Sequence, residues 1–213
     1  MLGRLYDATW GRGFAALYDR ALSRVEEGGL REERHALLAR ANGRVLELGA
    51  GTGLNLDHYP RSLKRLVLTE PDPHMAKRLR AHAAEAGVNA EIVEAPGEQL
   101  PFEDDSFDTV VSTLVLCTVP DLSGTLAEIA RVLKKGGRLL FIEHVRSEDE
   151  RLARWQDRLH GPWKFIGKGC NCNRDTLSAI RAWLEVEDAR HGELPASPPL
   201  TRPKIFGSAR ATA

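Results

Sequence analysis

From about residue 43 onward, short apolar runs bounded by turn residues alternate with segments of helical periodicity. Apolar runs of this length are typical of strands buried on both faces, and helices between them favour a parallel sheet. We therefore expect an α/β fold: a doubly wound, mostly parallel sheet with helices on both faces. The seven expected strands are Arg44–Leu48, Arg65–Thr69, Ala90–Val93, Thr109–Thr113, Arg138–Glu143, Leu184–Ala189 and Ile205–Arg210.

Two clear helical patterns lie between these strands. The first, Pro73–Glu85, ends before Gly87, and the second, Leu122–Lys134, carries basic residues in its last turn. Glycine after a helix allows the left-handed conformation that closes the last turn, and basic side chains favour the negative end of the helix. We therefore expect Gly87 and the pair Gly136–Gly137 to stop these two helices.

The first and last parts of the chain have weaker patterns. The charged segment Phe14–Ala41 predicts one or two helices ahead of the sheet, and Asn173 or Asp175 is a candidate cap for a helix reaching Trp183. The stretch Gly192–Pro203 joins the two final strands without helical periodicity. Because a parallel crossover needs a longer connection, we expect the last strand to be antiparallel.

Length and composition indicate one domain. A chain of 213 residues with 42% hydrophobic content buries one substantial core and is short for two domains. We predict a single domain over residues 1–213, with an N-terminal helical cap (1–42), a ligand-binding core (43–145) and an acceptor-side insertion with the final strands (146–213).

The charge balance and apolar runs narrow the choice of partners. The 30 basic and 30 acidic residues cancel, so no net field attracts phosphate backbones and we expect no nucleic acid partner. The longest apolar run, Thr109–Val119, has about half of the roughly 20 residues that cross a bilayer. The N-terminus lacks a continuous apolar signal region, which predicts a cytoplasmic location.

Three cysteines, Cys117, Cys170 and Cys172, show no framework spacing, which indicates reduced thiols inside a cell. The close pair Cys170 and Cys172 supplies at most half of a tetrahedral zinc site. Since no CxxC or HxxxH partner occurs elsewhere, the spacing predicts no metal site.

A glycine-rich loop carries the strongest chemical signal. The expected strand ending at Leu48 runs directly into Gly49-Ala50-Gly51-Thr52-Gly53, the position where open parallel sheets bind ligands. A nicotinamide dinucleotide loop would place its third glycine at position 54, which is leucine here. A phosphate loop would need Gly-Lys-Ser or Gly-Lys-Thr, and neither occurs in this sequence. Glu47 beside the loop favours a cationic ligand over a pyrophosphate.

Further signals follow in order along the chain. Glu70 ends the second expected strand, where an acidic side chain accepts both hydroxyls of an adenosine ribose. Then come Pro96-Gly97-Glu98, Leu100-Pro101-Phe102 and Ser106-Phe107-Asp108, the last at the start of the fourth strand.

With these motifs, residues 40 to 145 resemble the class I, Rossmann-like methyltransferases that use S-adenosylmethionine and release S-adenosylhomocysteine. The resemblance implies that Glu47 holds the methionyl amino group, that Glu70 holds the ribose, and that Gly97 and Glu98 lie along the adenine. Pro96 departs from many relatives, which carry Asp there. The implied cofactor-binding residues are Glu47, Gly49, Ala50, Gly51, Thr52, Gly53, Glu70, Pro71, Gly97, Glu98, Thr113 and Leu114.

A closer resemblance is to the alkyl thiol methyltransferase-like subgroup, which is related to quinone and phospholipid methyltransferases. It rests on the following segments: Asn55, Tyr59-Pro60, Thr113 to Cys117, Glu143-His144-Val145, Gly169-Cys170-Asn171, Arg174 and Arg202-Pro203. The resemblance implies a small-molecule acceptor and allows peripheral contact with a membrane surface. It leaves the choice between monomer and homodimer open.

The acceptor side offers three catalytic candidates. Cys117 follows the fourth strand, where related enzymes face the methyl donor and acceptor. The alternative is that Cys117 is a small core residue. His144 follows the fifth strand and is a candidate base, with a structural histidine as the alternative. Tyr18 lies on the expected N-terminal helix. It is a candidate for folding over the cofactor and closing the site, and the alternative is that it only packs within the protein. Trp155, His160, Trp163 and Phe165, with Pro162, Gly167 and Gly169 as breakers, form an aromatic insertion that predicts a hydrophobic acceptor.

The resulting hypothesis is methyl transfer to a small, fairly apolar acceptor, with a thiol preferred because of the resemblance alone. The first alternative is C- or N-methylation of a quinone precursor or a phospholipid amine. Two alternatives of another class are a non-catalytic adenosyl-binding regulator and a nicotinamide-dependent oxidoreductase, which the glycine spacing disfavours.

Overall fold

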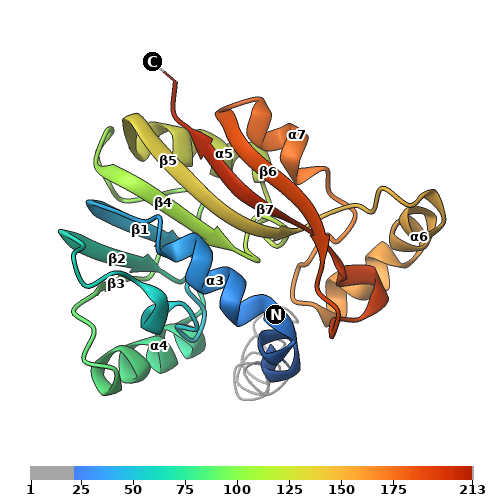
Figure 1. Ribbon diagram of the computed structural model, residues 1–213, viewed down its shortest axis with the longest axis horizontal. Coiled ribbons are helices and arrows are strands. Elements are labelled where there is room, and N and C mark those ends of the chain that lie inside the picture. Colours follow the sequence, from blue (N-terminus) through green and yellow to red (C-terminus); the bar gives the residue numbers. More distant parts are fainter. Residues whose placement is uncertain (1–21, 213) are drawn as a thin grey trace, which may run out of the picture.

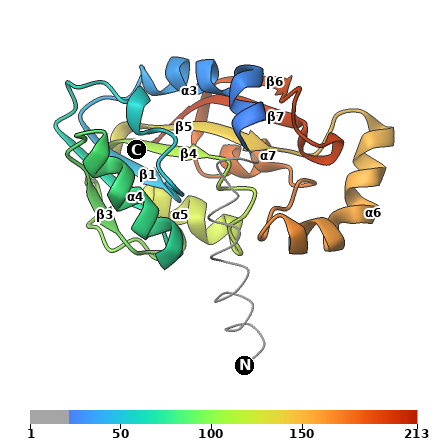
Figure 2. The same ribbon diagram turned by 90° about the horizontal axis from the view of Figure 1, so that it is seen from below.

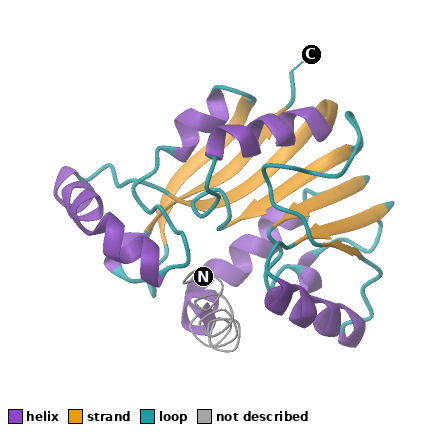
Figure 3. Ribbon diagram, turned by 180° about the vertical axis from the view of Figure 1, so that it is seen from behind, coloured by secondary structure: helices purple, strands orange, loops and turns teal. Residues whose placement is uncertain are grey.

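The computed structural model describes residues 22–212, and its strands form one 7-stranded sheet in the order β3-β2-β1-β4-β5-β7-β6 (Figures 1 and 3). Neighbouring strands from β3 to β5 are parallel, whereas β7 is antiparallel to both β5 and β6. This confirms the expected mostly parallel sheet with an antiparallel last strand. The strands are β1 (Arg44–Leu48), β2 (Arg65–Thr69), β3 (Glu91–Val93), β4 (Phe107–Thr113), β5 (Leu133–His144), β6 (Glu185–Glu193) and β7 (Pro203–Arg210).

Helices cover both faces of the sheet. One face packs against α5 and α7 through Leu126, Ile129 and Ile180, and the other against α3 and α4 through Leu37 and Leu79. Figure 2 shows α3 on one side of the sheet and α5 and α7 on the other. The helical segments are η2 (Glu26–Leu30), α3 (Arg31–Leu38), η3 (Leu56–His58), α4 (Pro73–Glu85), α5 (Leu122–Val132), α6 (Glu150–Ile166), α7 (Thr176–Arg181) and η4 (Pro199–Thr201).

Side-chain caps explain where several helices begin. The Asp72 carboxylate accepts hydrogen bonds from the backbone N–H groups of His74 and Met75 at the start of α4, where Pro73 occupies the first turn. Asp175 caps α7 by accepting from the Ser178 N–H, so the second of the two proposed caps is used. These bonds satisfy N–H groups that have no partner within the helix.

The second predicted helix is shorter than expected, and Gly136–Gly137 does not stop it. α5 ends at Val132, and Leu133 already has extended dihedral angles. The reason is that β5 begins there, because Leu133 pairs with Phe107 of β4. The two glycines therefore lie within β5, and Gly136 has a left-handed φ of 75°.

The aromatic insertion is a helix of 17 residues, α6, which continues through Pro162. The expectation that Pro162 breaks this segment is wrong, whereas Gly167 does follow its last residue. Gln156 attaches the helix to the body, since its amide nitrogen donates to the carbonyl oxygens of Val145, Cys172 and Leu200. These buried bonds hold a helix that otherwise projects from the end of the sheet (Figure 1).

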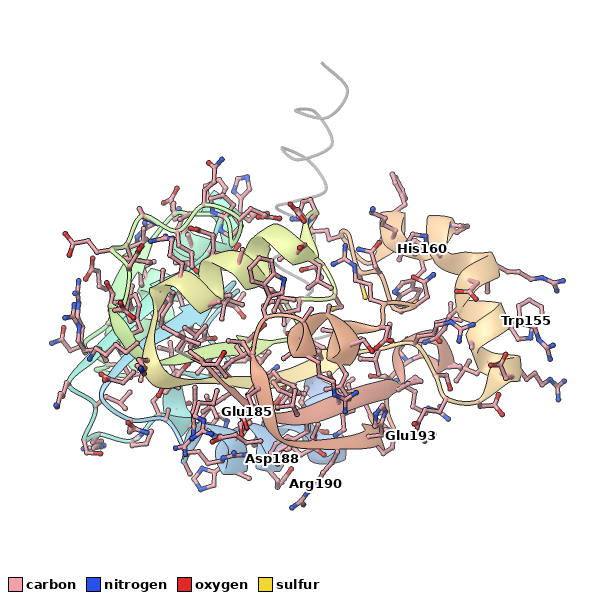
Figure 4. All side chains as sticks on the ribbon, turned by 90° about the horizontal axis from the view of Figure 1, so that it is seen from above. Trp155, His160, Glu185, Asp188, Arg190 and Glu193 are labelled. Atoms are coloured by element: carbon pink, nitrogen blue, oxygen red, sulfur yellow. The ribbon has the colours of Figure 1, made fainter. Side chains whose placement is uncertain are left out.

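The edges of the molecule show two further features. β6 is an edge strand, and Figure 4 shows Glu185, Asp188, Arg190 and Glu193 along it. Charged side chains on an edge strand disfavour pairing with another chain. Within residues 22–212, none of the helices is both long enough and apolar enough to cross a bilayer.

Candidate functional site

The glycine loop follows β1 at the carboxyl edge of the sheet. Gly49, Gly51 and Gly53 all have left-handed φ values, of 52°, 60° and 93°. A Cβ on Gly49 would lie 2.9 Å from a methyl group of Val115, a contact too close for any side chain. The loop therefore needs glycine both for its backbone conformation and for its approach to the turn after β4.

Glu70, at the end of β2, lies against this loop. One carboxylate oxygen accepts a hydrogen bond of 2.8 Å from the Gly51 N–H, and the other accepts one of 2.8 Å from the Asp72 N–H. The residue is 7% exposed. Burial raises the pKa of Glu70, and these two bonds oppose that rise. A carboxylate bears about four acceptor sites, so two remain for ribose hydroxyls.

Glu47 is buried near the end of β1 and has partners within the protein. Its carboxylate accepts hydrogen bonds from the Asn55 amide at 2.8 Å and from the Tyr59 hydroxyl at 2.6 Å. Burial raises its pKa, and both bonds stabilise the charged form. The carboxylate thus holds the segment after the glycine loop, and contact with a methionyl amino group remains a prediction.

Arg34 brings the helical segment before the sheet into the same network. Its guanidinium donates to the side-chain oxygens of Asn55 at 2.8 Å and Thr113 at 3.1 Å, and it pairs with Glu26 at 3.0 Å. Arg34 and Glu26 are 3% and 6% exposed. Sequence reasoning missed this residue because Arg34 reads as one charge among many in a polar helix.

The adenine side of the predicted site lies between β3 and α5. A Cβ on Gly97 would lie 3.1 Å from Thr125 of α5, so glycine allows close packing there. Glu98 accepts a hydrogen bond of 3.2 Å from the Asp121 N–H, at the start of that helix. Both residues are half-buried, and the predicted adenine contacts remain predictions.

Two predicted pocket residues end β4. The Thr113 hydroxyl accepts hydrogen bonds from Asn55 and Arg34. Leu114 has a left-handed φ of 61°, which is strained for a branched residue, and its N–H donates to the Ile142 carbonyl at 2.7 Å. Strain of this kind costs about 1–3 kcal/mol and concentrates at functional sites.

Glu143 organises the turn that follows. This carboxylate, at the end of β5, is fully buried and accepts hydrogen bonds from the Ser112 hydroxyl, the Val115 N–H and the Cys117 N–H, at 2.6, 3.1 and 3.2 Å. Burial raises its pKa, whereas these bonds favour the charged form. The 114–117 turn is therefore folded around a buried carboxylate.

Cys117 and His144, both predicted from the sequence, lie together. The Cys117 Sγ is 3.8 Å from the His144 Nδ1, and Cys170 from the loop after α6 is also 3.8 Å from that nitrogen. Both thiols are buried and the imidazole is half-buried. Hydrogen bonding between the thiols raises the pKa of Cys117 and lowers that of Cys170.

The loop of Cys170 also reaches the cofactor side. The Lys168 ammonium donates to the Asp72 carboxylate at 2.6 Å, two residues beyond Glu70. This bond joins the segment after α6 to the start of α4. The acceptor-side segment and the cofactor-side strands thus meet across the carboxyl edge of the sheet.

The remaining predicted residues are placed as follows. The Ala50 N–H donates to the Thr69 carbonyl, the Thr52 carbonyl contacts the His82 ring at 3.1 Å, and Pro71 is exposed next to Glu70. Tyr18 lies outside the described residues.

The aromatic residues of α6 take different positions relative to the site. Trp155 and Phe165 are 49% and 66% exposed on α6, and Figure 4 shows Trp155 on that projecting helix. Trp163 instead packs against the buried cysteines, and His160 bonds the Asn171 side chain at 2.7 Å. A hollow of about 690 Å³ lies at the amino ends of β2 and β3, and Tyr59 is among its lining residues.

Comparison with known proteins agrees with this geometry. The profile of a family described as "Methyltransferase domain" matches residues 46–141. Human thiol S-methyltransferase TMT1B is 39% identical over 185 residues, which cover 81% of this chain and 73% of the human protein. The ubiquinone/menaquinone biosynthesis C-methyltransferase UbiE of Marinomonas is 34% identical over 188 residues, 81% of this chain and 74% of that protein.

The fold has solved counterparts as well. The crystal structure of a SAM-dependent methyltransferase from Thermotoga maritima has a TM-score of 0.71 and 21% identity, over 94% of this chain and 97% of that one. At this identity the likeness concerns the fold, whereas the curated relatives share extended sequence. Together with the glycine loop and Glu70, these findings confirm that the chain belongs to the class I S-adenosylmethionine-dependent methyltransferases.

Proposed function

We propose that this methyltransferase methylates a small, fairly apolar thiol. The observation that carries the proposal is the similarity to human thiol S-methyltransferase TMT1B over 81% of the chain. That likeness extends well beyond the methyltransferase domain of residues 46–141. It therefore includes segments outside the cofactor core, where acceptor specificity arises in this fold.

The residues at the cofactor end fit S-adenosylmethionine. The left-handed glycines leave the loop without side chains, and Glu70 retains acceptor sites beside the loop N–H groups. When bound, this cofactor supplies an electrophilic methyl group. We propose that Glu70 holds the ribose, that Glu47 attracts the methionyl ammonium, and that Leu114 closes the pocket.

The acceptor end supports a thiol because it is apolar and holds few charges. The Cys117 side chain packs with Cys170, Trp163 and Leu200, and the neighbouring Glu143 is enclosed by its own hydrogen bonds. A free thiol has a pKa near 8.5 and loses its proton readily, so positioning in a dry pocket supplies much of the rate. The half-buried His144 is the candidate base that accepts the proton of the thiol.

Transfer to a panel of acceptors tests the proposal. The purified protein is incubated with S-adenosylmethionine and, separately, with a short alkyl thiol, a quinone precursor and phosphatidylethanolamine, and products are identified by mass spectrometry. We expect a methyl thioether from the thiol. We also expect His144→Ala to lower turnover more than it lowers cofactor affinity.

Other outcomes would select the alternatives. Methylation of the quinone precursor on carbon or of the lipid amine on nitrogen, with no thioether, would replace the thiol by the runner-up acceptors. Binding of S-adenosylmethionine without transfer to any acceptor would favour a non-catalytic adenosyl-binding regulator. The nicotinamide oxidoreductase does not remain, because the chain belongs to the methyltransferases.

We also propose peripheral contact with an anionic membrane surface through α6. Trp155, Phe165 and Ile166 are 49%, 66% and 58% exposed on this helix. Exposed basic residues lie on the same helix: Arg151, Arg154, Arg158 and Lys164. A helix that combines exposed aromatic and basic side chains is typical of an interfacial position in anionic bilayers.

Vesicle flotation tests this contact. We expect the protein to float with vesicles containing phosphatidylglycerol and not with pure phosphatidylcholine, and Trp155→Ser/Phe165→Ser to abolish flotation. Trp183→Ser is a matched control, since Trp183 is 42% exposed outside α6. Equal flotation of the two variants would contradict the assignment. A cytoplasmic location, a monomeric or homodimeric state and the division into cap, core and acceptor segments stay predictions.

A further inference from the structure

Three ligand atoms from distant parts of the chain gather at the acceptor end of the sheet. Cys117 lies in the turn after β4, His144 ends β5, and Cys170 lies in the loop after α6. Both Sγ atoms lie 3.8 Å from the His144 Nδ1, and the three atoms lie within 4.8 Å of one another. The spacing of these residues in the sequence predicts no metal site. Spacing alone does not show which distant side chains come together in the fold.

The sulfur–nitrogen separations are close to those of a tetrahedral metal site. With Zn–S bonds of about 2.3 Å and Zn–N bonds of about 2.0–2.1 Å, tetrahedral geometry places two sulfur ligands about 3.8 Å apart and sulfur and nitrogen about 3.6 Å apart. The observed sulfur to nitrogen distance of 3.8 Å is slightly longer than the expected sulfur to nitrogen distance. A small movement of the side chains would remove the difference. Thiolate and imidazole are the ligands that Zn²⁺ prefers.

We propose that Cys117, His144 and Cys170 bind a borderline-soft divalent cation of the Zn²⁺ type and leave its fourth coordination position for the acceptor thiol. The first half of this proposal stands on the three residues alone. The second half rests on the proposed thiol acceptor. Three protein ligands with one open position are typical of catalytic rather than structural zinc sites.

The loops that carry the ligands are held in place by a shared residue. The Asn171 N–H and side-chain amide donate to the Cys117 carbonyl at 2.7 and 3.1 Å, and the same amide donates to the Gly169 carbonyl. Arg174 donates to the Leu116 carbonyl at 2.7 Å. Outer contacts of this kind orient metal ligands before the cation arrives.

Burial and charge also fit a cation. Cys117 and Cys170 are 1% and 6% exposed, whereas His144 is half-buried. Trp163 and Leu200 cover the sulfur side. Two thiolates neutralise a divalent cation, so the cation and its protein ligands carry no net charge before the acceptor binds.

The cation would change how the acceptor loses its proton. Binding by two cysteine thiolates releases their two protons to solvent. When the acceptor thiol takes the fourth position, its S–H bond breaks, a sulfur–metal bond forms, and the proton leaves to solvent. The acceptor is then held as a thiolate at neutral pH. In this arrangement His144 is a metal ligand and not the base.

Cobalt binding tests the first half. The protein is treated with reductant and chelator, desalted, and titrated with Co²⁺, which reports thiolate ligands by a near-ultraviolet charge-transfer band and tetrahedral geometry by strong visible absorption. We expect one equivalent per chain, and loss of these bands in Cys117→Ser and Cys170→Ser. Cys172→Ser is the matched control, because Cys172 is equally buried one residue beyond Asn171 yet outside the trio.

Further variants keep the test decisive if a serine variant fails to fold. Circular dichroism reports folding for each protein, and titration of the wild-type chain needs no variant. Asn171→Ala should lower Co²⁺ affinity about 10- to 100-fold, as expected for a residue that orients ligands. His144→Cys should retain Co²⁺ with a stronger charge-transfer band. A wild-type chain that shows no such bands holds a hydrogen-bonded thiol cluster only, which would overturn the proposal.

The second half is tested on the cobalt-loaded protein. Addition of a short alkyl thiol should shift the visible absorption, because a third thiolate enters the coordination sphere. No shift, with normal methylation of the same thiol, would overturn the open-position role. Cobalt bands without methylation of any thiol would overturn the proposed function and leave the metal site standing, so the two failures are distinguishable.

Discussion

At the scale of single residues, Glu70 supports the glycine loop and is the predicted ribose contact. We expect Glu70→Gln to weaken S-adenosylmethionine binding by about 1.5–3 kcal/mol, roughly 10- to 150-fold in Kd, because hydroxyls would lose a charged acceptor. Isothermal titration calorimetry measures the change. Glu94→Gln is the control, since Glu94 is an exposed acid that pairs with Arg80. An unchanged Kd for the Glu70 variant would remove its ribose role.

Glu47 predicts a specific dependence of stability on pH. Burial raises its folded-state pKa above the ordinary value of 4.5. Between these two values the folded chain binds more protons than the unfolded chain, so the stability contributed by Glu47 falls as pH rises. Relative to Glu47→Gln, the wild-type protein should lose stability from about pH 4.5 upward and then level off. Urea unfolding at several pH values checks this, and a rising difference would contradict it.

Arg34 predicts a large stability effect. Arg34→Met would leave the Glu26 carboxylate buried without its partner, a loss of about 3–5 kcal/mol by urea unfolding. Arg40→Met is a matched control, because Arg40 pairs with Asp188 while their side chains are 35% and 43% exposed. We expect a loss of about 1 kcal/mol or less there. Equal losses would show that the Arg34 pair behaves as a surface pair.

These residues also show what single positions allow one to predict. The glycine loop, Glu47 and Glu70 were recognisable because their spacing is local and repeated in known enzymes. Arg34 and Cys170 were not, because their partners are far away in the chain: Arg34 meets Thr113, and Cys170 meets Cys117. Local patterns carry no information about which distant side chains converge.

At the scale of elements, β1, β2 and α4 coincide with their predicted bounds, since apolar runs, Asp72 and Pro73 mark their ends. α5 and β5 differ because strand pairing of Leu133 overrides the helical pattern that continues to Lys134. α6 continues through Pro162, which was expected to break the helix. The hydrogen bonds of Gln156 to the body of the protein outweigh the unfavourable effect of this proline. Tertiary contacts thus decided the elements whose local signals were ambiguous.

α6 itself predicts that two substitutions stabilise the protein. Pro162→Ala restores a backbone donor inside the helix, and Gly161→Ala adds a Cβ that meets nothing within 4 Å. Helix propensity favours alanine by about 3 kcal/mol over proline and about 1 kcal/mol over glycine as upper values. We expect both variants to raise the free energy of unfolding, Pro162→Ala more than Gly161→Ala. The opposite order would contradict the argument from helix propensity.

At the scale of the whole molecule, the doubly wound topology brings the ends of β1, β2, β4 and β5 to one edge. Glu47, Glu70 and Glu143 are buried carboxylates at three of these ends, and each is satisfied by hydrogen bonds to loops rather than by a lysine or arginine directly. These three carboxylates place negative charge at the edge, beside the basic side chains of Arg34 and Lys168. Such an edge suits a sulfonium and an ammonium better than a pyrophosphate.

This charge pattern predicts which cofactors stabilise the fold. A ligand at 100 times its Kd adds about 2.7 kcal/mol to the free energy of unfolding. For a domain of this size, 1 kcal/mol shifts Tm by about 2–4 °C, so S-adenosylmethionine should raise Tm by roughly 5–11 °C. S-adenosylhomocysteine should do likewise, whereas NADH should leave Tm unchanged because its pyrophosphate would face buried carboxylates. Differential scanning fluorimetry compares the three ligands, and an equal shift with NADH would contradict the electrostatic argument.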